Sequence, residues 1–230
     1  MENNDNSSSH RSEDYDNQIK DTIPYYESIH EETVNIIKTV MDEPKIWLDT
    51  GCGTGTLVKK AFDQFNKTCF LLADPSMEML NIARYKLSEK SQERIKFLEP
   101  VETAKISLDD DCKPDVITAV QAHHYMSRAD RLKATKTCYE LLGDNGLYIT
   151  FENIRPDTDQ GIEIVKGYIK KFQLSRGRDS ETIDNFLKRF DVEYFPIKVS
   201  EHKSLLREAG FKVVEMFWMS YMQAGFYALP

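Results

Sequence analysis

Two kinds of apolar pattern divide the chain into strands and helices. Short, continuous apolar runs are typical of strands that are covered on both faces, and such runs occupy residues 45–49, 68–74, 95–99, 115–120 and 146–151. Apolar residues that recur every three or four positions predict helices over about 24–41, 55–65, 76–88 and 128–142. Strands that alternate with helices indicate βαβ units in a parallel sheet.

The alternation breaks after residue 154. Two amphipathic helices follow with no strand between them, so we expect a small helical cap inserted at about 155–195. A helix that ends at Gly210 comes next. The last two apolar runs, 212–219 and about 222–229, lie close enough in sequence to pair as an antiparallel hairpin. The predicted fold class is therefore α/β, with a doubly wound seven-stranded sheet whose last strand is antiparallel.

Composition and charge narrow the classes of protein. Residues 1–14 contain almost nothing apolar and predict a disordered tail, which leaves one domain over 15–230. The net charge of −8 disfavours general nucleic-acid binding. No apolar run approaches the roughly 18 residues that a membrane span needs. The four cysteines are widely spaced without a CxxC pair, so we expect a reducing, cytoplasmic location.

The strongest chemical pattern is the sequence LDTGCGTG at residues 48–55, which follows a strand and opens a helix. Glycines at this place let the chain turn sharply and let a ligand approach the backbone. Asp49 stands at the carboxyl end of the strand, where its carboxylate can hold a cationic amino group. A phosphate would instead favour bare amides at the helix N-terminus. The alternative is a tight strand-to-helix turn that binds no ligand.

A second carboxylate, Asp74, ends the next strand, 19 residues after Gly55. A carboxylate at this place can accept the protons of both ribose hydroxyls of a nucleoside. Its alternative role is to cap the helix that begins near Ser76. The glycine turn beside it favours the ribose role.

These motifs resemble those of the class I S-adenosylmethionine-dependent methyltransferases, and the resemblance covers about residues 15–229. It implies a Rossmann-like fold that binds S-adenosylmethionine across the ends of the first, second and fourth strands. It also implies an enzyme that transfers a methyl group to a small-molecule acceptor. The cofactor-binding residues that it implies are Asp49, Gly51, Cys52, Gly53, Asp74, Pro75, Ser76, Met77 and Gln121.

The C-terminal part resembles a narrower branch, the carboxy-S-adenosylmethionine synthases of tRNA wobble-uridine modification. The similarity lies in residues 205–211 and 225–229. That branch holds an additional carboxylate with an arginine, and only Lys188 and Arg189 fall near this place. The synthase activity is therefore an alternative, and a non-catalytic S-adenosylmethionine-binding protein is a further one.

His123 and His124 follow the fourth strand and are the candidate catalytic residues. A histidine can titrate near neutral pH and act as a general base for an acceptor that loses a proton. Their alternative role is packing against the cofactor or a helix. No acid lies three or four residues after either histidine, so we expect no metal site.

Tyr15, Tyr25 and Tyr26 can form an N-terminal lid that places aromatic faces near the sulfonium, which makes Tyr15 and Tyr25 further candidate cofactor contacts. The alternative for Tyr25 and Tyr26 is packing within a helix. Arginines of the cap region can hold an anionic acceptor, although scattered surface arginines are the commoner case. These are Arg155, Arg176, Arg178 and Arg189. We expect a monomer or a homodimer.

Overall fold

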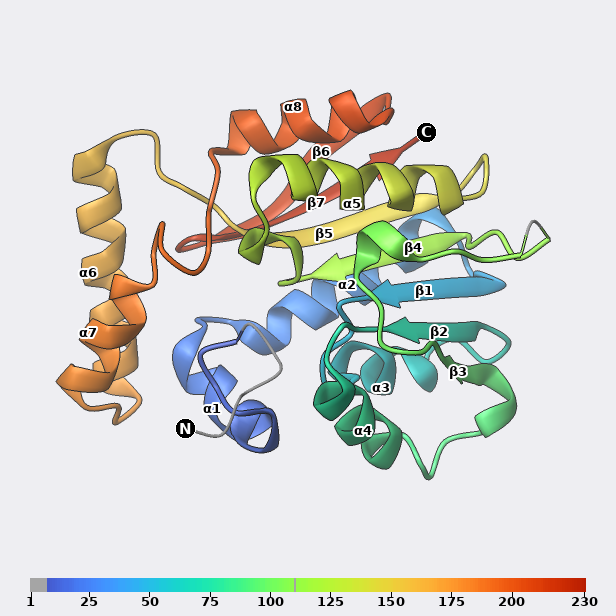
Figure 1. Ribbon diagram of the computed structural model, residues 1–230, viewed down its shortest axis with the longest axis horizontal. Helices are drawn as coiled ribbons and strands as arrows, with labels where there is room; N and C mark the ends of the chain where they lie inside the picture. The colour runs from blue at the N-terminus through green and yellow to red at the C-terminus, as the bar shows by residue number, and fades with distance from the viewer. Residues whose placement is uncertain (1–7, 110) are drawn as a thin grey trace.

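The computed structural model describes residues 8–109 and 111–230 (Figure 1). Its centre is a seven-stranded sheet in the order β3-β2-β1-β4-β5-β7-β6. The strands are β1 Ile46–Thr50, β2 Cys69–Ala73, β3 Ile95–Phe97, β4 Val116–Val120, β5 Leu147–Asn153, β6 Val213–Ser220 and β7 Gln223–Leu229. β7 is antiparallel to both β5 and β6, whereas the pairs among the first five strands are parallel. The predicted doubly wound sheet with an antiparallel last strand is confirmed.

The strand order reverses between β1 and β4. The chain runs outward from β1 through β2 to β3 and then returns to the other side of β1. Trp47 of β1 accordingly pairs with Phe70 of β2 and with Val116 of β4. At such a switch point the connecting loops leave in opposite directions and open a crevice outside the carboxyl ends of the strands. The arrowheads of β1, β2 and β4 in Figure 1 point toward this crevice.

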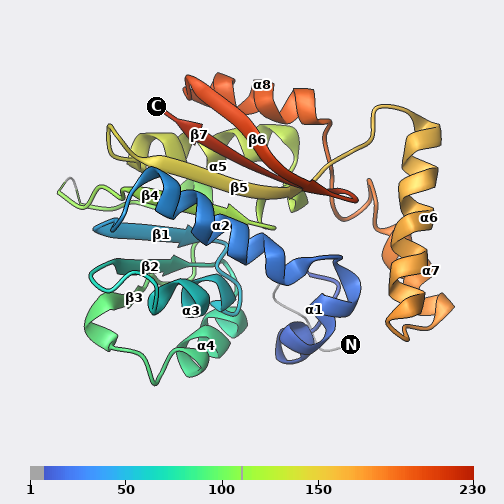
Figure 2. The same cartoon turned by 180° about the vertical axis from the view of Figure 1, so that it is seen from behind.

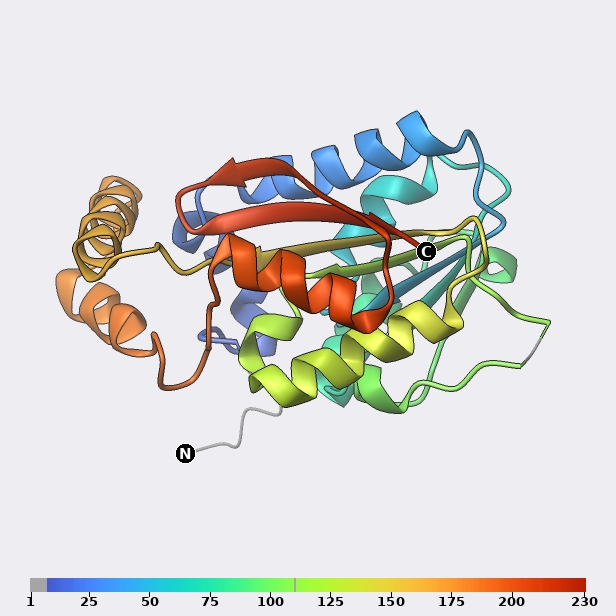
Figure 3. The same cartoon turned by 90° about the horizontal axis from the view of Figure 1, so that it is seen from above.

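Helices cover both faces of the sheet (Figure 3). One face carries α2 Tyr26–Val40, α3 Thr56–Phe62 and α4 Met77–Lys86, and α1 Tyr15–Thr22 lies beyond the carboxyl ends of the strands (Figure 1). These helices bury apolar side chains such as Ile29, Val58 and Leu80 against the strands. The other face carries α5 Arg128–Leu141 and α8 Val199–Ala209. None of the helices in the described part of the chain is long and apolar enough to cross a membrane.

The segment in which we expected one helix from about residue 24 begins differently. Pro24 lies between α1 and α2, and Tyr25 adopts a left-handed backbone with φ 57° just before α2. Proline lacks an amide hydrogen and cannot continue the preceding helix. Helix α1 buries Ile19 and Thr22. Two buried side chains are too few to produce a clear periodic pattern. The spacing of apolar residues therefore did not predict α1.

Residues 8–14, which we expected to belong to a disordered tail, are placed against the domain. His10 is 2% exposed, and its ring nitrogens each lie 2.8 Å from a side-chain oxygen, one of Gln18 and one of Thr22. Ser12 Oγ donates a hydrogen bond to Glu78 Oε2 of α4 over 3.1 Å. These polar contacts order a segment that is poor in apolar residues. The remainder of the predicted tail, residues 1–7, lies outside the described residues.

The predicted helical cap contains α6 Asp159–Ser175 and α7 Ser180–Lys188. These two helices stand beyond the carboxyl ends of the parallel strands, close to α1 (Figure 2). Gln173 Nε2 donates a hydrogen bond to the carbonyl oxygen of Thr22 over 3.1 Å. Arg176 Nε donates to Asp21 Oδ1 over 2.8 Å. The helix pair is thereby tied to the N-terminal segment.

Candidate active site

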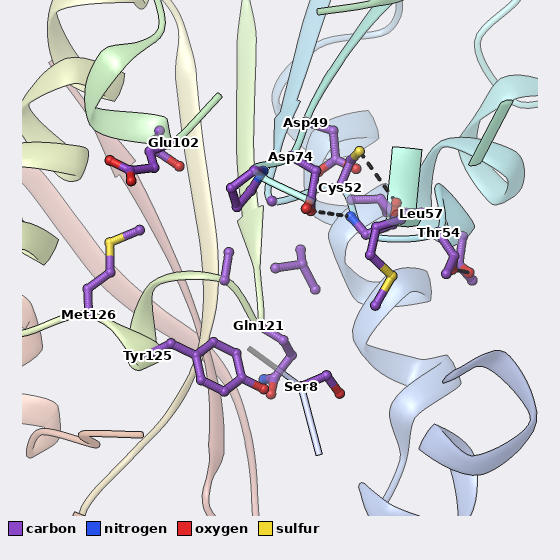
Figure 4. A pocket seen from close by; sticks show the side chains of 18 of the residues that line it. Ser8, Asp49, Cys52, Thr54, Leu57, Asp74, Glu102, Gln121, Tyr125 and Met126 are labelled. Atoms are coloured by element: carbon purple, nitrogen blue, oxygen red, sulfur yellow. Dashed lines mark hydrogen bonds between the residues drawn. The ribbon is translucent and has the colours of Figure 1, made fainter. Parts of the chain in front are cut away.

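A cavity of about 830 Å³ lies at the carboxyl ends of β1, β2 and β4 (Figure 4). Its walls come from the turns that follow these strands, from the 3-10 turn Thr103–Lys105 after β3, and from α1 and α2. The structure brings most of the predicted cofactor-binding residues to these walls. They are Tyr15, Asp49, Gly51, Cys52, Gly53, Asp74, Pro75 and Gln121.

The turn after β1 requires glycine at position 51 for two reasons. The φ of Gly51 is +65°, and a Cβ there would lie 2.5 Å from the Cβ of Ala122 in the turn after β4. Gly53 also has a positive φ, +53°, but no atom lies within 4 Å of the place of its Cβ. The amide of Gly53 donates a hydrogen bond to Asp74 Oδ2 over 2.9 Å. This hydrogen bond links the glycine turn after β1 to the loop after β2, which carries Asp74.

Asp74 is an organising carboxylate in the cavity wall. It accepts hydrogen bonds from the amides of Gly53 and Ser76, each over 2.9 Å. The cap of α4 is made by Ser76, whose Oγ accepts from the amide of Met79 over 3.0 Å. The alternative role of Asp74 as the helix cap is therefore filled by Ser76. Asp74 is 7% exposed and faces the cavity, which suits a ribose-binding group.

Asp49 is a buried carboxylate at the end of β1. It is 2% exposed, and its Oδ1 accepts a hydrogen bond from Thr118 Oγ1 over 2.6 Å. Trp47 Nε1 donates to the same Thr118 oxygen over 2.9 Å, which orients the hydroxyl toward Asp49. Burial raises the pKa of Asp49 to about 7, and the charge of Asp74 adds to the rise. A cationic ligand group beside Asp49 would offset the cost of burying its charge.

Gln121 lines the cavity from the turn after β4. Its backbone has φ 55°, a left-handed conformation that is uncommon for residues other than glycine. The backbone amide of Gln121 donates to the carbonyl oxygen of Phe151 over 2.7 Å, which fixes the turn. Its buried side-chain Nε2 has no hydrogen-bond partner among the described residues. Such a donor fits a ligand that supplies an accepting oxygen.

Aromatic side chains form the wall next to α1 and α2. Tyr15, Tyr26 and Tyr125 line the cavity, whereas Tyr25 is 62% exposed and its ring lies near that of Tyr221. Burial raises the pKa values of Tyr15 and Tyr26, so both phenols remain protonated donors at neutral pH. Tyr15 therefore lies in the cavity wall, where the expected contact would be made, whereas Tyr25 is not among the described residues that line the cavity.

His30 is a cavity residue that we did not single out from the sequence. It lies on α2 one turn after Tyr26, is 5% exposed, and its ring centroid is 4.7 Å from that of Tyr26. Burial lowers the pKa of His30 to about 4, and the charges of Lys60 and Lys86 add to this effect. The imidazole is therefore neutral. The signal that could have found it is its spacing of four residues from Tyr26, which places both on one helix face.

The structure does not support a catalytic role for His123 or His124. Each is 1% exposed, and neither is among the described residues that line the cavity. His124 Nδ1 donates to the buried Glu152 Oε2 over 3.1 Å, and His123 Nε2 lies 3.2 Å from Thr103 Oγ1. Burial lowers the pKa of His123 to about 4 and lowers that of His124. The packing role is the one that this geometry favours.

Other predicted contacts also lie away from the cavity. Ser76 is buried as the helix cap, and Met77 is 42% exposed on α4. Each cap-region arginine bonds an acid or a hydroxyl: Arg155 with Asp191, Arg176 with Asp21, Arg178 with Thr22 and Arg189 with Glu193. None of the four is among the described residues that line the cavity. The structure therefore offers no support there for an anionic acceptor.

Comparisons with known proteins agree with this site. A family model described as a methyltransferase domain matches residues 48–148, which include the glycine turn, Asp74 and Gln121. Carboxy-S-adenosyl-L-methionine synthase from Trichodesmium erythraeum is 23% identical over 204 residues. That match covers 87% of this chain and 79% of the relative.

Solved structures show the same fold. A protein from Nostoc punctiforme, described as a candidate O-methyltransferase, is 14% identical with a TM-score of 0.65, and the match covers 87% of this chain and 55% of that one. Human N-acetylserotonin methyltransferase, solved in complex with S-adenosylmethionine, is 15% identical with a TM-score of 0.60, and the match covers 97% and 59%. The chain thus spans little more than half the length of these two structures. The matched methyltransferase-domain model, the synthase relatives and the carboxylates at the ends of β1 and β2 together support a class I S-adenosylmethionine-dependent methyltransferase.

Proposed function

We propose that the protein transfers a methyl group from S-adenosylmethionine to a small-molecule acceptor inside the cavity. The observation that carries the proposal is that Asp49, Asp74 and Gln121 share one cavity, whose wall includes Ser8 and Tyr15 of the N-terminal segment. The volume of about 830 Å³ lies within the range of roughly 300–1,000 Å³ that is usual for small-molecule sites. Walls on this scale favour a small acceptor over a macromolecule.

The residues that would hold S-adenosylmethionine follow from their chemistry. Asp74 would accept hydrogen bonds from the ribose hydroxyls, and Asp49 would pair with the ammonium group of the amino-acid end. Gln121 Nε2 would donate to an accepting oxygen. The bound cofactor supplies an activated methyl group on its sulfonium. The turns after β1, β2 and β4 therefore account for its recognition.

The protein's remaining tasks are to align the acceptor and to exclude water. Tyr15, Tyr26 and Tyr125 surround the space in which this alignment would occur. A general base is needed only for an acceptor that has a proton to lose. Since His123 and His124 are buried outside the cavity, the proposal assigns no proton transfer to them.

Cofactor affinity should rise with pH because Asp49 has to be ionised to pair with an ammonium group. Its pKa of about 7 means that protonation at lower pH competes with binding. Between pH 5.5 and pH 7.0 the association constant for S-adenosylmethionine should increase about tenfold. Titration calorimetry across this range measures the effect. 5′-Methylthioadenosine lacks the ammonium group and should bind with a flat profile, and a flat profile for both ligands would contradict the pairing.

The methyl transfer itself can be tested on a mixture of candidate acceptors. The protein is incubated with S-adenosylmethionine and a metabolite extract, and mass spectrometry follows S-adenosylhomocysteine and every product that gains a methyl group. We expect both signals with the unmodified chain and neither with Asp49→Ala. S-Adenosylmethionine binding without either signal would contradict methyl transfer.

Synthesis of carboxy-S-adenosylmethionine is the second candidate function. It is favoured by curated relatives of that name that are 22–24% identical to this chain. Against it, Arg189 is bonded to Glu193 and is not among the described residues that line the cavity. The same incubation distinguishes the two functions, because a synthase would yield a cofactor nucleoside that carries an additional carboxyl group.

A further inference from the structure

The imidazole of His30 lines the cavity without a hydrogen-bond partner among the described residues. It is 5% exposed, and neither ring nitrogen forms a hydrogen bond with any residue in 8–109 or 111–230. Its ring packs on Tyr26 and its side chain lines the cavity. Buried polar groups in proteins are nearly always hydrogen-bonded, so an unpaired one in a cavity wall indicates a ligand contact.

Several charged residues of the cavity wall come from the ends of neighbouring strands. Lys105 follows β3, Asp74 follows β2 and Asp49 ends β1, which are neighbouring strands in this order. Tyr26 of α2 lies close enough to Asp49 for the carboxylate to raise the pKa of its phenol. A nucleoside that spans this row, with its ribose at Asp74 and its ammonium group at Asp49, has the end of its amino-acid chain beside α2. On this end the ammonium and the carboxylate share one carbon atom.

The groups around His30 suit an anion. The ring centroid of Tyr26 lies 4.7 Å from that of His30, and Tyr15 lines the same cavity. Phenol O–H and imidazole N–H groups are hydrogen-bond donors. Lys60 and Lys86 act more strongly on the His30 ring than the acids Asp16 and Glu27. Both lysines also pair with acids, Lys60 with Glu31 and Lys86 with Asp16. A carboxylate is the ligand group whose accepting oxygens and negative charge suit the phenol and imidazole donors beside it.

We propose that His30 donates a hydrogen bond to the carboxylate at the amino-acid end of S-adenosylmethionine. It thereby selects cofactors that carry this carboxylate. The inference rests on the proposed function for the identity of the cofactor, and it adds a specificity-determining residue to the three that the turns after the strands provide. The proposal concerns binding and involves no covalent step.

The test compares two ligands in two proteins by titration calorimetry at pH 7.5. The ligands are S-adenosylmethionine and decarboxylated S-adenosylmethionine, which keeps the amine and lacks the carboxylate. Because a hydrogen bond to a charged group is worth roughly tenfold or more in affinity, His30→Phe should weaken S-adenosylmethionine binding by at least about tenfold. Binding of the decarboxylated ligand should stay within about twofold. His30→Asn, which keeps a donor, should restore part of the loss.

His202→Phe is the matched control. His202 is also buried, 2% exposed, and both its ring nitrogens are unpaired among the described residues, but it packs on Phe226 outside the cavity. The His202→Phe variant should bind S-adenosylmethionine and decarboxylated S-adenosylmethionine as tightly as the unmodified protein does. Equal weakening of both ligands by His30→Phe, or no weakening of either, would overturn the assignment of His30. If the unmodified protein failed to bind S-adenosylmethionine at all, the proposed function would fall, and this inference with it.

Discussion

Asp49→Asn is expected to abolish S-adenosylmethionine binding while leaving the free protein more stable at pH 8. Loss of a buried charge partner should weaken binding by roughly 100-fold or more. The folded-state pKa of about 7 lies above the unfolded value, so folding favours the neutral carboxyl. That contribution is complete below about pH 4 and is lost as the pH rises through 7. Asparagine is neutral at every pH and can still accept the hydrogen bond from Thr118.

The expected gain in stability of Asp49→Asn is measured by thermal unfolding of the ligand-free protein. At pH 8 the variant should melt roughly 4–8 °C higher, which corresponds to about 2 kcal/mol in a domain of this size. At pH 4.5 the two proteins should melt alike. Asp157→Asn, at a side chain that is 84% exposed, should change neither property. Tight binding by Asp49→Asn would show that this carboxylate does not hold the ammonium group.

Gly51→Ala should combine two destabilising effects and remove the cofactor site. A left-handed backbone at alanine costs about 1–2 kcal/mol, and the new methyl group would lie 2.5 Å from the Cβ of Ala122. Ala122 cannot rotate its Cβ away. The total is about 3 kcal/mol, so the melting temperature should fall by roughly 6–12 °C. Circular dichroism measures the fall, and calorimetry should detect no S-adenosylmethionine binding.

Gly53→Ala supplies the comparison. Its φ of +53° gives the same backbone strain, but the added Cβ meets no atom within 4 Å. We expect a loss of about 1 kcal/mol and a melting temperature roughly 2–4 °C lower. Similar melting temperatures for the two variants would mean that the turns after β1 and β4 separate easily, in contrast to the close approach at Gly51.

The parts of the site that could be predicted from the sequence are those set by local chemistry. Asp49 and Asp74 each end a continuous apolar strand, so a parallel sheet necessarily brings them to the same edge. The glycine turn is visible because positive φ angles need a particular residue type. Both features are encoded in short stretches of the chain, and both line the cavity.

The parts that were missed depend on partners far away along the chain. His124 looked reactive from its position after β4, but its Nδ1 donates to Glu152 on the next strand of the sheet. The directions in which Tyr25 and Tyr26 point depend on where α2 begins, and a left-handed residue at its start cannot be read from apolar spacing. His30 has no motif around it. Its spacing from Tyr26 places both on one face of α2, but its burial and the absence of a partner among the described residues are seen only in the three-dimensional structure.

The N-terminal segment has a consequence for the speed of ligand exchange. Lys86 Nζ and Thr54 Oγ1 hold Asp16 at 2.5 and 2.7 Å, while Gln173 of α6 holds the far end of the same helix at Thr22. A molecule that enters or leaves past Tyr15 has to wait for these contacts to break together. Local unfolding of α1 would then limit how fast a product leaves by this path, and hydrogen exchange of the α1 amides would measure the rate of that unfolding.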